Sequence, residues 1–558
     1  MGKKIIIVGG VAGGATAAAR LRRLSEEDEI IMLEKGEYIS FANCGLPYYI
    51  GGVITNRDAL LVQTVEGMSK KFNLDIRNLS EAVGIDRDKQ TVEIKDLRTG
   101  NVYTENYDRL ILSPGARPIV PPLPGYEEAE NIFTLRSVPD TDKIKGWVDE
   151  RQPKQAVIVG GGFIGLEMAE NLAHLGIEVT LVELGDQVMG TLDYEMAAMV
   201  QKELIEKGVR VILKDGVKAF YDQGKEVELA SGRKLVSDMT ILSIGVRPEN
   251  ELATGAGLAV GDRGGIVVNQ HLQTEDENIY AIGDAIEVKD YIHQVPTMVP
   301  LAWPANRQGR LVADHINGMN AAYKGTLGTS VAKIFDLTAA TTGSNEKVLK
   351  RLGVTYEAVH VHPISNAGYY PGGSPLALKL LFHPVTGEIY GAQAVGLKGV
   401  EKRIDVIATA IKGKLTVADL ADLELAYAPP YSSAKDPVNL AGYAAANVVE
   451  GDLKVVHHDE IDRIVAEGGV LIDVREPAER EIGFIPGSVN IPLGQLRDRL
   501  HELPKDQPIY VGCQVGLRGY LAVKTLMNHG FEAINLSGGY KTYRMAKKVE
   551  SQRKVSIS

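Results

Sequence analysis

Two glycine-rich turns, each placed between an apolar strand and a helix, constrain this 558-residue chain more than any other feature. The first turn follows the apolar run 4–8 and precedes a helix of small residues, 15–24. A second apolar run, 30–33, then ends on Glu34, twenty positions after Gly14. Unbroken apolar runs are typical of strands buried in a parallel sheet. The pattern therefore predicts a β-α-β unit at the N-terminus.

The composition of the first turn favours a dinucleotide site but fits the usual pattern imperfectly. Its glycines are Gly9, Gly10, Gly13 and Gly14. Val11 stands where the G-x-G-x-x-G pattern has its second glycine, so a plain tight turn remains an alternative at this point. In a dinucleotide site the pyrophosphate lies at the helix N-terminus, and an acid at the end of the second strand accepts hydrogen bonds from ribose. Glu34 has the position for that role.

A second copy of the unit has glycine at all three positions of the pattern, Gly160, Gly162 and Gly165. It follows the strand 156–159 and is followed by the helix 166–175 and a strand that ends on Glu183. Two such units indicate two bound dinucleotides. A carboxylate at Glu183 would repel a 2′-phosphate, which predicts a preference for NADH over NADPH.

Other loops near these units supply further candidate residues. Ser113 and Gly115 lie in the crossover 112–118, which has a matching crossover at 242–248. Asp284 follows a strand predicted over 278–282. An aspartate there could bond the ribityl chain of a flavin, although Gly-Asp is also a common turn.

From 325 to 446 the pattern changes to shorter strands and helices without a dinucleotide turn. Two turns in this segment carry Tyr369, beside proline and glycine, and Tyr427, beside prolines, and packing tyrosines in ordinary turns explain them equally well. Residues 447–458 are interpreted as a linker, in which the pair His457-His458 is expected to be solvated. The histidines show no metal-ligand spacing.

The last segment, about 455–545, alternates short strands and helices, which predicts a small α/β domain. An apolar strand over 508–512 leads directly into Cys513, and a helix follows over 519–527. Backbone N–H groups of a curved loop can point at one sulfur and stabilise a thiolate or persulfide, and Arg518 adds positive charge at the end of the loop. The alternative is an incidental loop cysteine.

Cys44 and Cys513 are the two cysteines of the chain. Structural disulfides would come as a denser set, so both thiols are expected to be reduced in the cytoplasm. The apolar run 5–19 is broken by glycines, and neither an export signal nor a membrane span is expected there. The net charge of -11 argues against a general nucleic-acid binder.

Residues 1–446 resemble the flavin- and NAD(P)H-dependent disulfide reductases, and within them the coenzyme A-disulfide reductase group. The two dinucleotide turns, Gly283-Asp284 and the block 40–48 around Cys44 carry this resemblance. Residues from about 455 resemble a rhodanese domain. The segments that carry this second resemblance are Asp473–Glu476, Ile485–Ser488 and Cys513–Arg518.

The resemblance implies an α/β chain of two Rossmann-like domains, an α+β dimerisation domain and a C-terminal α/β rhodanese domain, assembled as a homodimer. The implied boundaries are 1–118 with 245–324 for FAD, 119–244 for NADH, 325–446 for dimerisation, 447–458 for the linker and 459–550 for the rhodanese domain.

The resemblance also implies a set of site residues. For FAD these are Gly9, Gly14, Glu34, Lys35, Ser113, Gly115 and Asp284, and for NADH they are Gly160, Gly162, Gly165 and Glu183. For coenzyme A they are Arg20, Arg23, Ser40, Asn43, Lys71, Asn306 and Arg307. Cys44 would cycle between a thiolate and a mixed disulfide with coenzyme A, and Tyr369 and Tyr427 would reach in from the partner subunit.

The expected function is NADH-dependent reduction of coenzyme A disulfide, coenzyme A persulfide or polysulfide, coupled to sulfur transfer at Cys513. The alternative is an NADH oxidase or peroxidase in which Cys44 cycles through a sulfenic acid. A third hypothesis makes the rhodanese-like segment a docking or sulfur-sensing module. Beside an oxidised flavin and a helix N-terminus, Cys44 is expected to be a thiolate at neutral pH. Gln514 and Val515 leave the Cys513 loop weakly cationic, which disfavours thiosulfate as the donor.

Overall fold

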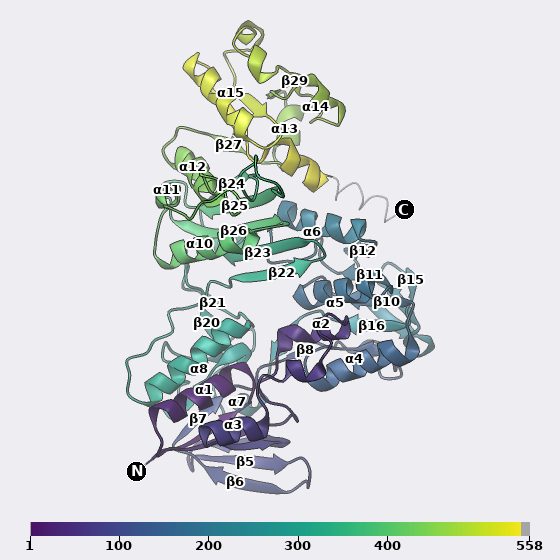
Figure 1. The fold of residues 1–558 in the computed structure, drawn as a ribbon, viewed down its shortest axis with the longest axis vertical. Coiled ribbons are helices and arrows are strands. Elements are labelled where there is room, and N and C mark those ends of the chain that lie inside the picture. The colour runs from purple at the N-terminus through teal and green to yellow at the C-terminus, as the bar shows by residue number, and fades with distance from the viewer. Residues whose placement is uncertain (1, 548–558) are drawn as a thin grey trace. The chain divides into compact units, whose positions relative to one another are not determined.

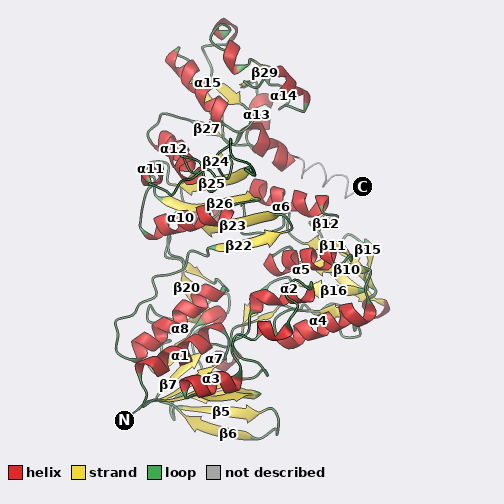
Figure 2. Ribbon diagram, in the orientation of Figure 1, coloured by secondary structure: helices red, strands yellow, loops and turns green. Residues whose placement is uncertain are grey.

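The computed structural model describes residues 2–547, which divide into two compact units. The first unit contains residues 2–182 and 215–328, and the second contains 183–214 and 329–547. Both units mix helices and strands, as Figures 1 and 2 show, which confirms the predicted α/β class. The predicted end of the last domain, at residue 550, lies outside the described residues.

The first sheet of the first unit contains the N-terminal β-α-β unit. Its strand order is β19-β7-β1-β2-β3, and every pair is parallel. The bounds are β1 (Lys4–Val8), β2 (Glu29–Glu34), β3 (Asp75–Asn78), β7 (Arg109–Leu112) and β19 (Ile279–Ala281). Helix α1 (Ala12–Leu24) begins three residues before the predicted start and packs on α8 (Ala302–Ile316). The isoleucines of β1 are fully buried, as an unbroken apolar run requires.

The second sheet of this unit contains the other β-α-β unit. Four parallel strands run in the order β11-β10-β16-β9. The bounds are β9 (Ile132–Phe133), β10 (Gln155–Val159), β11 (Glu178–Glu183) and β16 (Met239–Leu242). Helix α5 (Phe163–His174) follows β10, and α4 (Val138–Arg151) precedes it. Helix α5 packs against α2 (Leu46–Ile50), the short helix that follows Cys44, and so brings the second β-α-β unit next to the cysteine segment.

Smaller elements also belong to the first unit. Two antiparallel three-stranded sheets have the orders β4-β5-β6 and β13-β14-β15. Their bounds are β4 (Ser80–Asp86), β5 (Thr91–Asp96), β6 (Val102–Asn106), β13 (Val217–Tyr221), β14 (Glu226–Leu229) and β15 (Lys234–Val236). The crossovers predicted at 112–118 and 242–248 pair through β8 (Ala116–Pro118) and β17 (Val246–Pro248), and α3 (Val65–Phe72) lies near α1.

The second unit has an antiparallel sheet at its centre, in the order β22-β23-β26-β25-β24. The bounds are β22 (Ser330–Ile334), β23 (Leu337–Gly343), β24 (Glu357–Val361), β25 (Leu376–Phe382) and β26 (Ile389–Gly396). Helix α10 (Val400–Lys412) packs on β23 and β26, α12 (Pro437–Val449) packs on β24 and β25, and α6 (Tyr194–Glu206) contacts β26. Strands β25 and β26 are buried along their whole length, so side chains on both faces need partners from these helices.

The C-terminal part of the second unit is a parallel sheet in the order β27-β31-β30-β28-β29. The strands are β27 (Val455–Val456), β28 (Val470–Asp473), β29 (Val489–Asn490), β30 (Ile509–Gly512) and β31 (Ala533–Leu536). Its helices include α13 (Ile461–Ala466), α14 (Pro477–Glu481) and α15 (Leu517–Asn528), and residues 539–547 are also helical.

The segment interpreted as a linker, 447–458, contains the end of α12 and strand β27. The expectation that His457 and His458 are solvated is wrong. His457 Nε2 lies 2.7 Å from a carboxylate oxygen of Glu357, and His458 Nε2 lies 3.4 Å from one of Glu195. Among residues 2–547, no helix combines the length and the apolar character that a membrane span requires.

Candidate functional site

Both glycine-rich turns have the backbone geometry that a pyrophosphate site needs. Gly9 and Gly160 have positive φ, and a Cβ on either would lie 2.0 Å or 2.4 Å from a backbone oxygen of the neighbouring strand loop. Gly14 and Gly165 lie against the first glycine of their own turns. A Cβ on Gly14 would lie 1.8 Å from the Gly9 carbonyl oxygen, and one on Gly165 would lie 2.0 Å from the Gly160 carbonyl oxygen. Side chains are therefore excluded where the helix must approach the strand closely.

The helices after these turns begin without a competing acid. Among the described residues, neither α1 nor α5 has a side-chain cap or an acidic residue in its first turn. The N–H groups at both N-termini are therefore available to an anion, and the helix dipole favours a negative charge there. The residues present therefore fit a dinucleotide at each turn. In the second turn, Gly162 is the N-cap residue of α5.

The acids at the ends of the second strands hold the backbone of their own turns. Glu34 accepts hydrogen bonds from the N–H groups of Gly10 (2.8 Å) and Gly36 (2.7 Å). Glu183 accepts one from Gly185 (2.6 Å). Lys35, the residue after Glu34, forms an ion pair with Glu249 at 3.1 Å. Each carboxylate has further lone pairs that can accept a ribose hydroxyl.

Asp284 lies in the short 3-10 helix Gly283–Ala285, one residue after the end of β19, where the sequence predicted a flavin-binding aspartate. Its carboxylate forms an ion pair with Arg136 at 3.6 Å. Burial raises the pKa of Asp284, although Arg136 opposes that shift. Arg136 also lies under Gly115, where a Cβ would come within 2.8 Å of its guanidinium. Ser113 is fixed by its N–H bond to the Val8 carbonyl (2.7 Å). Sequence reasoning missed Arg136, because no motif marks it.

Cys44 is an exposed free thiol in the 3-10 helix Asn43–Gly45. Partial burial, followed by the negative charges of Glu167 and Asp284, raises the pKa of this thiol. The charges of the chain therefore oppose the thiolate that the sequence predicted. Helix α2 has five residues, too few for a strong dipole. A thiolate at neutral pH would need positive charge or electron-poor surroundings from a bound cofactor.

Glu167 on α5 is the second residue that sequence reasoning missed near Cys44. Burial, followed by the charge of Glu170, raises the pKa of Glu167 to about 7. Tyr48, one helical turn after Cys44, hydrogen-bonds to Glu167, and burial and this carboxylate raise the pKa of Tyr48 to about 12. Glu167 can thus carry or release a proton near Cys44 at neutral pH.

The residues predicted to hold coenzyme A come from neighbouring helices of the first unit. They are Arg20 and Arg23 on α1, Lys71 on α3, Asn306 and Arg307 on α8, and Ser40 and Asn43 just before α2. Two are already engaged: Arg20 forms an ion pair with Asp314 (2.6 Å), and Asn306 accepts a hydrogen bond from Thr16 (2.6 Å). Arg23 and Arg307 are exposed. The nearby Arg22 is buried and donates to backbone carbonyls, so its role is structural.

Tyr369 and Tyr427 lie together in the second unit, although 58 positions separate them. Their hydroxyl oxygens are 2.7 Å apart, and the two side chains are 76% and 46% exposed. Tyrosines that packed a turn would be covered, so the packing explanation is wrong for this pair. The hydrogen bond between the two hydroxyl groups raises the pKa of Tyr427.

Cys513 directly follows β30 and is buried, with its sulfur facing the start of α15. The N–H of Gly516 donates to Sγ at 3.1 Å, and within residues 2–547 it is the one backbone donor to this sulfur. The prediction that several N–H groups point at the sulfur is therefore only partly correct for the loop as it stands. Gly516 has a φ of 101°, a conformation that favours glycine, and this turns its N–H toward the sulfur.

Arg518 does not add free positive charge to the loop. Both of its terminal nitrogens donate to Glu479 at 2.6 Å, in a bidentate ion pair. That pair lowers the pKa of Glu479 to about 2. Arg475, buried beside the loop, is paired with Asp473 at 2.7 Å and lies 3.3 Å from the Gln514 side chain. Glu479 is 39 positions from Arg518, so local sequence gave no signal of the pairing.

Three known families match successive parts of the chain. Residues 3–350 match the pyridine nucleotide-disulphide oxidoreductase family, 329–437 match its dimerisation domain, and 457–546 match the rhodanese-like domain. Among curated proteins, the coenzyme A disulfide reductase of Staphylococcus epidermidis is 38% identical over 444 residues, which cover 79% of this chain and 99% of that protein.

The solved structures that match include two that cover almost the whole chain. Reduced Bacillus anthracis CoADR-RHD is 62% identical with a TM-score of 0.97 and covers 99% of each chain. The NAD-dependent persulfide reductase from A. fulgidus is 38% identical with a TM-score of 0.89, over 97% of this chain and 100% of that one. The resemblance inferred from the motifs is confirmed. With two dinucleotide turns, a single thiol beside them and a rhodanese-like domain at its C-terminus, the chain belongs to the pyridine nucleotide-disulphide oxidoreductase family.

Proposed function

We propose that this enzyme uses NADH and FAD to reduce coenzyme A disulfide, coenzyme A persulfide or polysulfide at Cys44, and that Cys513 feeds sulfane sulfur to this reaction. The observation that carries the proposal is the cysteine count. Cys44 and Cys513 are the two cysteines of the chain, and they belong to different units. An internal disulfide with a close neighbour is therefore impossible at Cys44, and the second sulfur must come from the substrate.

The chemistry at Cys44 follows from this single thiol. The Cys44 thiolate attacks the S–S bond of coenzyme A disulfide, one coenzyme A leaves as a thiolate that takes up a proton, and a Cys44–coenzyme A mixed disulfide remains. Two electrons and one proton then restore the Cys44 thiolate and release the second coenzyme A as a thiol. Bound FAD would supply the electron pair that NADH provides as hydride. Glu167 and Tyr48 lie where a proton can be stored near this thiol.

The helices around the coenzyme A positions supply the charge that this substrate needs. Coenzyme A carries a 3′-phosphate and a diphosphate, and Arg23, Lys71 and Arg307 provide cationic groups from three helices of one unit. An enzyme acting on peroxide or oxygen needs no such anion site. This cluster therefore favours coenzyme A chemistry over the oxidase alternative.

The active assembly is proposed to be a homodimer in which Tyr427, with Tyr369 beside it, serves the Cys44 site of the partner subunit. The supporting observation is the exposed, hydrogen-bonded pair of hydroxyl groups. A Cys44→Ser chain mixed with a Tyr427→Phe chain should regain activity, because one hybrid site then has both groups. This arrangement would be contradicted if both single variants were impaired and verified heterodimers of the two regained no activity. The cytoplasm is the proposed compartment, where both thiols stay reduced.

The test compares acceptors on one preparation of the FAD-loaded protein. NADH oxidation is measured without oxygen with coenzyme A disulfide, coenzyme A persulfide and polysulfide in turn, and then with oxygen or peroxide alone. We expect Cys44→Ser to abolish every sulfur-dependent rate while FAD stays bound. Cys513→Ser should spare coenzyme A disulfide reduction and remove sulfur transfer from rhodanese donors. Oxygen or peroxide turnover faster than all sulfur acceptors would replace the proposal with the oxidase alternative.

A further inference from the structure

After β31 the chain makes a turn at residues 537–538 and enters a helix at residue 539. The segment 537–542, called here the turn 537–542, contacts the antiparallel sheet of the second unit on one side. His360, on β24, donates its backbone N–H to the Ser537 hydroxyl at 3.0 Å, and its ring Nδ1 lies 3.1 Å from the same oxygen. His362 Nε2 lies 2.8 Å from the Thr542 hydroxyl. These side chains are buried or half-buried, so the contacts are shielded from competing water.

The other side of the same turn supports the Cys513 loop. The N–H of Tyr540 donates to the Cys513 carbonyl at 2.7 Å, and that of Lys541 donates to the Gln514 carbonyl at 3.0 Å. The peptide backbone at Cys513 is thus fixed by two hydrogen bonds from the turn. The acceptors of these bonds are thus Cys513 itself and the residue that follows it.

Two consecutive glycines let the turn fit both neighbours at once. A Cβ on Gly538 would lie 2.9 Å from the Cβ of His360, and one on Gly539 would lie 2.5 Å from the Cys513 carbonyl oxygen. Both glycines have positive φ. The turn is therefore closely packed between β24 and the Cys513 loop at this point. A shift of His360 would move the turn and, with it, the loop.

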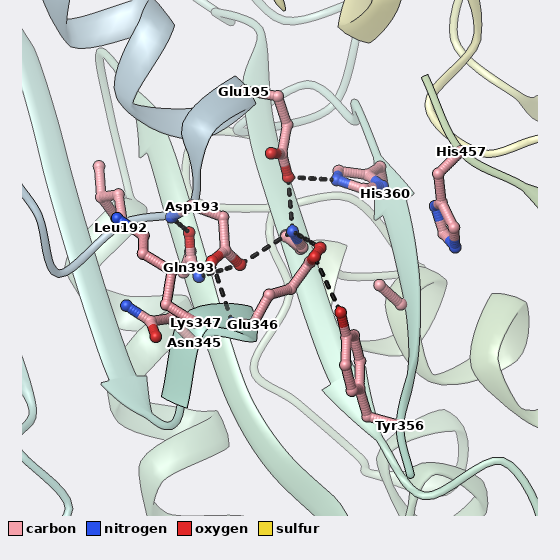
Figure 3. A network of polar contacts seen from close by, with 12 residues as sticks. Leu192, Asp193, Glu195, Asn345, Glu346, Lys347, Tyr356, His360, Gln393 and His457 are labelled. Atoms are coloured by element: carbon pink, nitrogen blue, oxygen red, sulfur yellow. Dashed lines mark hydrogen bonds and ion pairs between the residues drawn. The ribbon is translucent and has the colours of Figure 1, made fainter. Parts of the chain in front are cut away.

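His360 is itself held by a buried charge network, which Figure 3 shows. Its Nε2 lies 2.8 Å from Glu195, and Glu195 accepts a hydrogen bond from the buried ammonium of Lys379 at 2.6 Å. Burial opposes the charge of Glu195, but Lys379 and the hydrogen bonds from His360 and His458 hold the pKa of this carboxyl well below its usual range.

The network fixes which ring nitrogen of His360 carries the proton. Burial lowers the pKa of His360 to about 4, so the ring is neutral at pH 7. An ionised Glu195 can only accept, so Nε2 must carry the hydrogen. Nδ1 is then a bare acceptor for the Ser537 O–H, while the Ser537 oxygen accepts the backbone N–H of His360.

We propose that His360 is a positioning residue for sulfur transfer at Cys513, acting through Ser537 and the turn 537–542. The rhodanese-like domain then takes part of the geometry of its reactive loop from the antiparallel sheet outside it. This rests on the proposed function only in assigning sulfur transfer to Cys513. The chemical class of substrate is unchanged, a donor of sulfane sulfur, and His360 touches neither it nor the sulfur.

A matched pair of substitutions separates positioning from stability. In His360→Asn the amide oxygen replaces Nδ1 and keeps the acceptor for Ser537, but the bond to Glu195 is lost. In His360→Gln the amide reaches Glu195 and leaves Ser537 without its acceptor. Both variants remove one of two ring hydrogen bonds from the same buried site, so a purely structural role affects them alike. Ser537→Ala removes the contact from the other side.

Sulfur transfer from polysulfide to cyanide is measured on the full-length, FAD-loaded protein. We expect kcat/KM to fall about tenfold in His360→Gln and Ser537→Ala, less than the roughly hundredfold loss that a 1 Å misplacement of a reacting group can cause, and to change less than about twofold in His360→Asn. NADH-dependent reduction of coenzyme A disulfide should stay at the wild-type rate in all three variants, which shows that they are folded. Equal losses in His360→Asn and His360→Gln, or none in either, would overturn the proposal.

Hydrogen exchange gives a readout that does not depend on the proposed function. The amides of Tyr540 and Lys541 should exchange faster in His360→Gln and Ser537→Ala but not in His360→Asn. If the wild-type protein transfers no sulfur, the proposed role of Cys513 fails, while exchange still decides whether His360 positions the loop. Unchanged exchange at both amides in His360→Gln would overturn the positioning role by itself.

Discussion

Lys379 offers the sharpest test of how the second unit is held together. Its side chain is fully buried, with 0% exposed, in the middle of β25. The ammonium lies 2.8 Å from Asp193, 2.6 Å from Glu195 and 2.5 Å from Glu346, the three acids labelled in Figure 3. These three carboxylates are close enough together to hold a metal ion, but the lysine nitrogen contacts all of them. Replacing Lys379 with Met keeps most of the volume and removes the charge.

The expected loss of stability is large because three carboxylates would share one buried space without a cation. Removing one partner of a buried ion pair costs about 3–5 kcal/mol. With a urea m-value of about 2–3 kcal/mol/M, the unfolding midpoint of the second unit should fall by about 1–2.5 M. Lys350→Met is the matched control, since Lys350 bonds the same Glu346 at 2.8 Å but is 61% exposed. It should cost less than about 1 kcal/mol.

The contribution of these carboxyls to the pH dependence of stability should change sign between the wild type and Lys379→Met. In the wild type, Lys379 and Lys350 outweigh the burial of Glu346 and lower its pKa to about 2, so that its stabilising contribution is lost as the pH falls toward this value. Without Lys379 the buried carboxyls have raised pKa values in the folded state. Their protonated forms then favour folding at low pH, and Lys379→Met should lose more stability relative to wild type at about pH 8 than at about pH 5.

The assay must report on the correct unit. Both tryptophans, Trp147 and Trp303, lie in the first unit, so fluorescence would miss the transition. Far-UV circular dichroism in urea gives the unfolding midpoint. Hydrogen exchange of peptides from β25 shows whether the change in stability lies in the second unit. The reasoning would be refuted if Lys379→Met and Lys350→Met had the same midpoint and the same β25 exchange at about pH 8.

Three further outcomes are expected. Glu167→Gln should lower the pKa of Cys44, seen as faster alkylation above about pH 8 and not below about pH 6, because the pKa of Glu167 is about 7; an identical pH profile would contradict the charge coupling. Glu479→Gln should release Arg518 and lower the KM for thiosulfate about fivefold in sulfur transfer to cyanide, whereas an unchanged KM would mean that the ion pair does not limit anionic donors. Glu183→Ala should raise kcat/KM for NADPH about tenfold, and a wild-type protein that already prefers NADPH would show that other residues decide the cofactor.

The local sequence was sufficient where a function depends on neighbouring residues. A strand, a glycine turn and a helix lie within about thirty residues, so both β-α-β units and the placement of Asp284 after β19 could be predicted. The position of Cys513 directly after a predicted strand was also correct. The cysteine count alone excluded an internal redox disulfide at Cys44.

Tertiary structure decided how those elements are charged and supported. Lys379 interrupts an apolar strand and would be placed at the surface by sequence alone, yet it is buried because Asp193 and Glu195 meet it from 186 and 184 positions away. Arg518 looks cationic in sequence but is paired with Glu479. His457, expected in a solvated linker, bonds Glu357 across 100 positions. Burial and pairing between distant residues depend on how strands and helices pack, and no local pattern encodes which residue will lie opposite a charge.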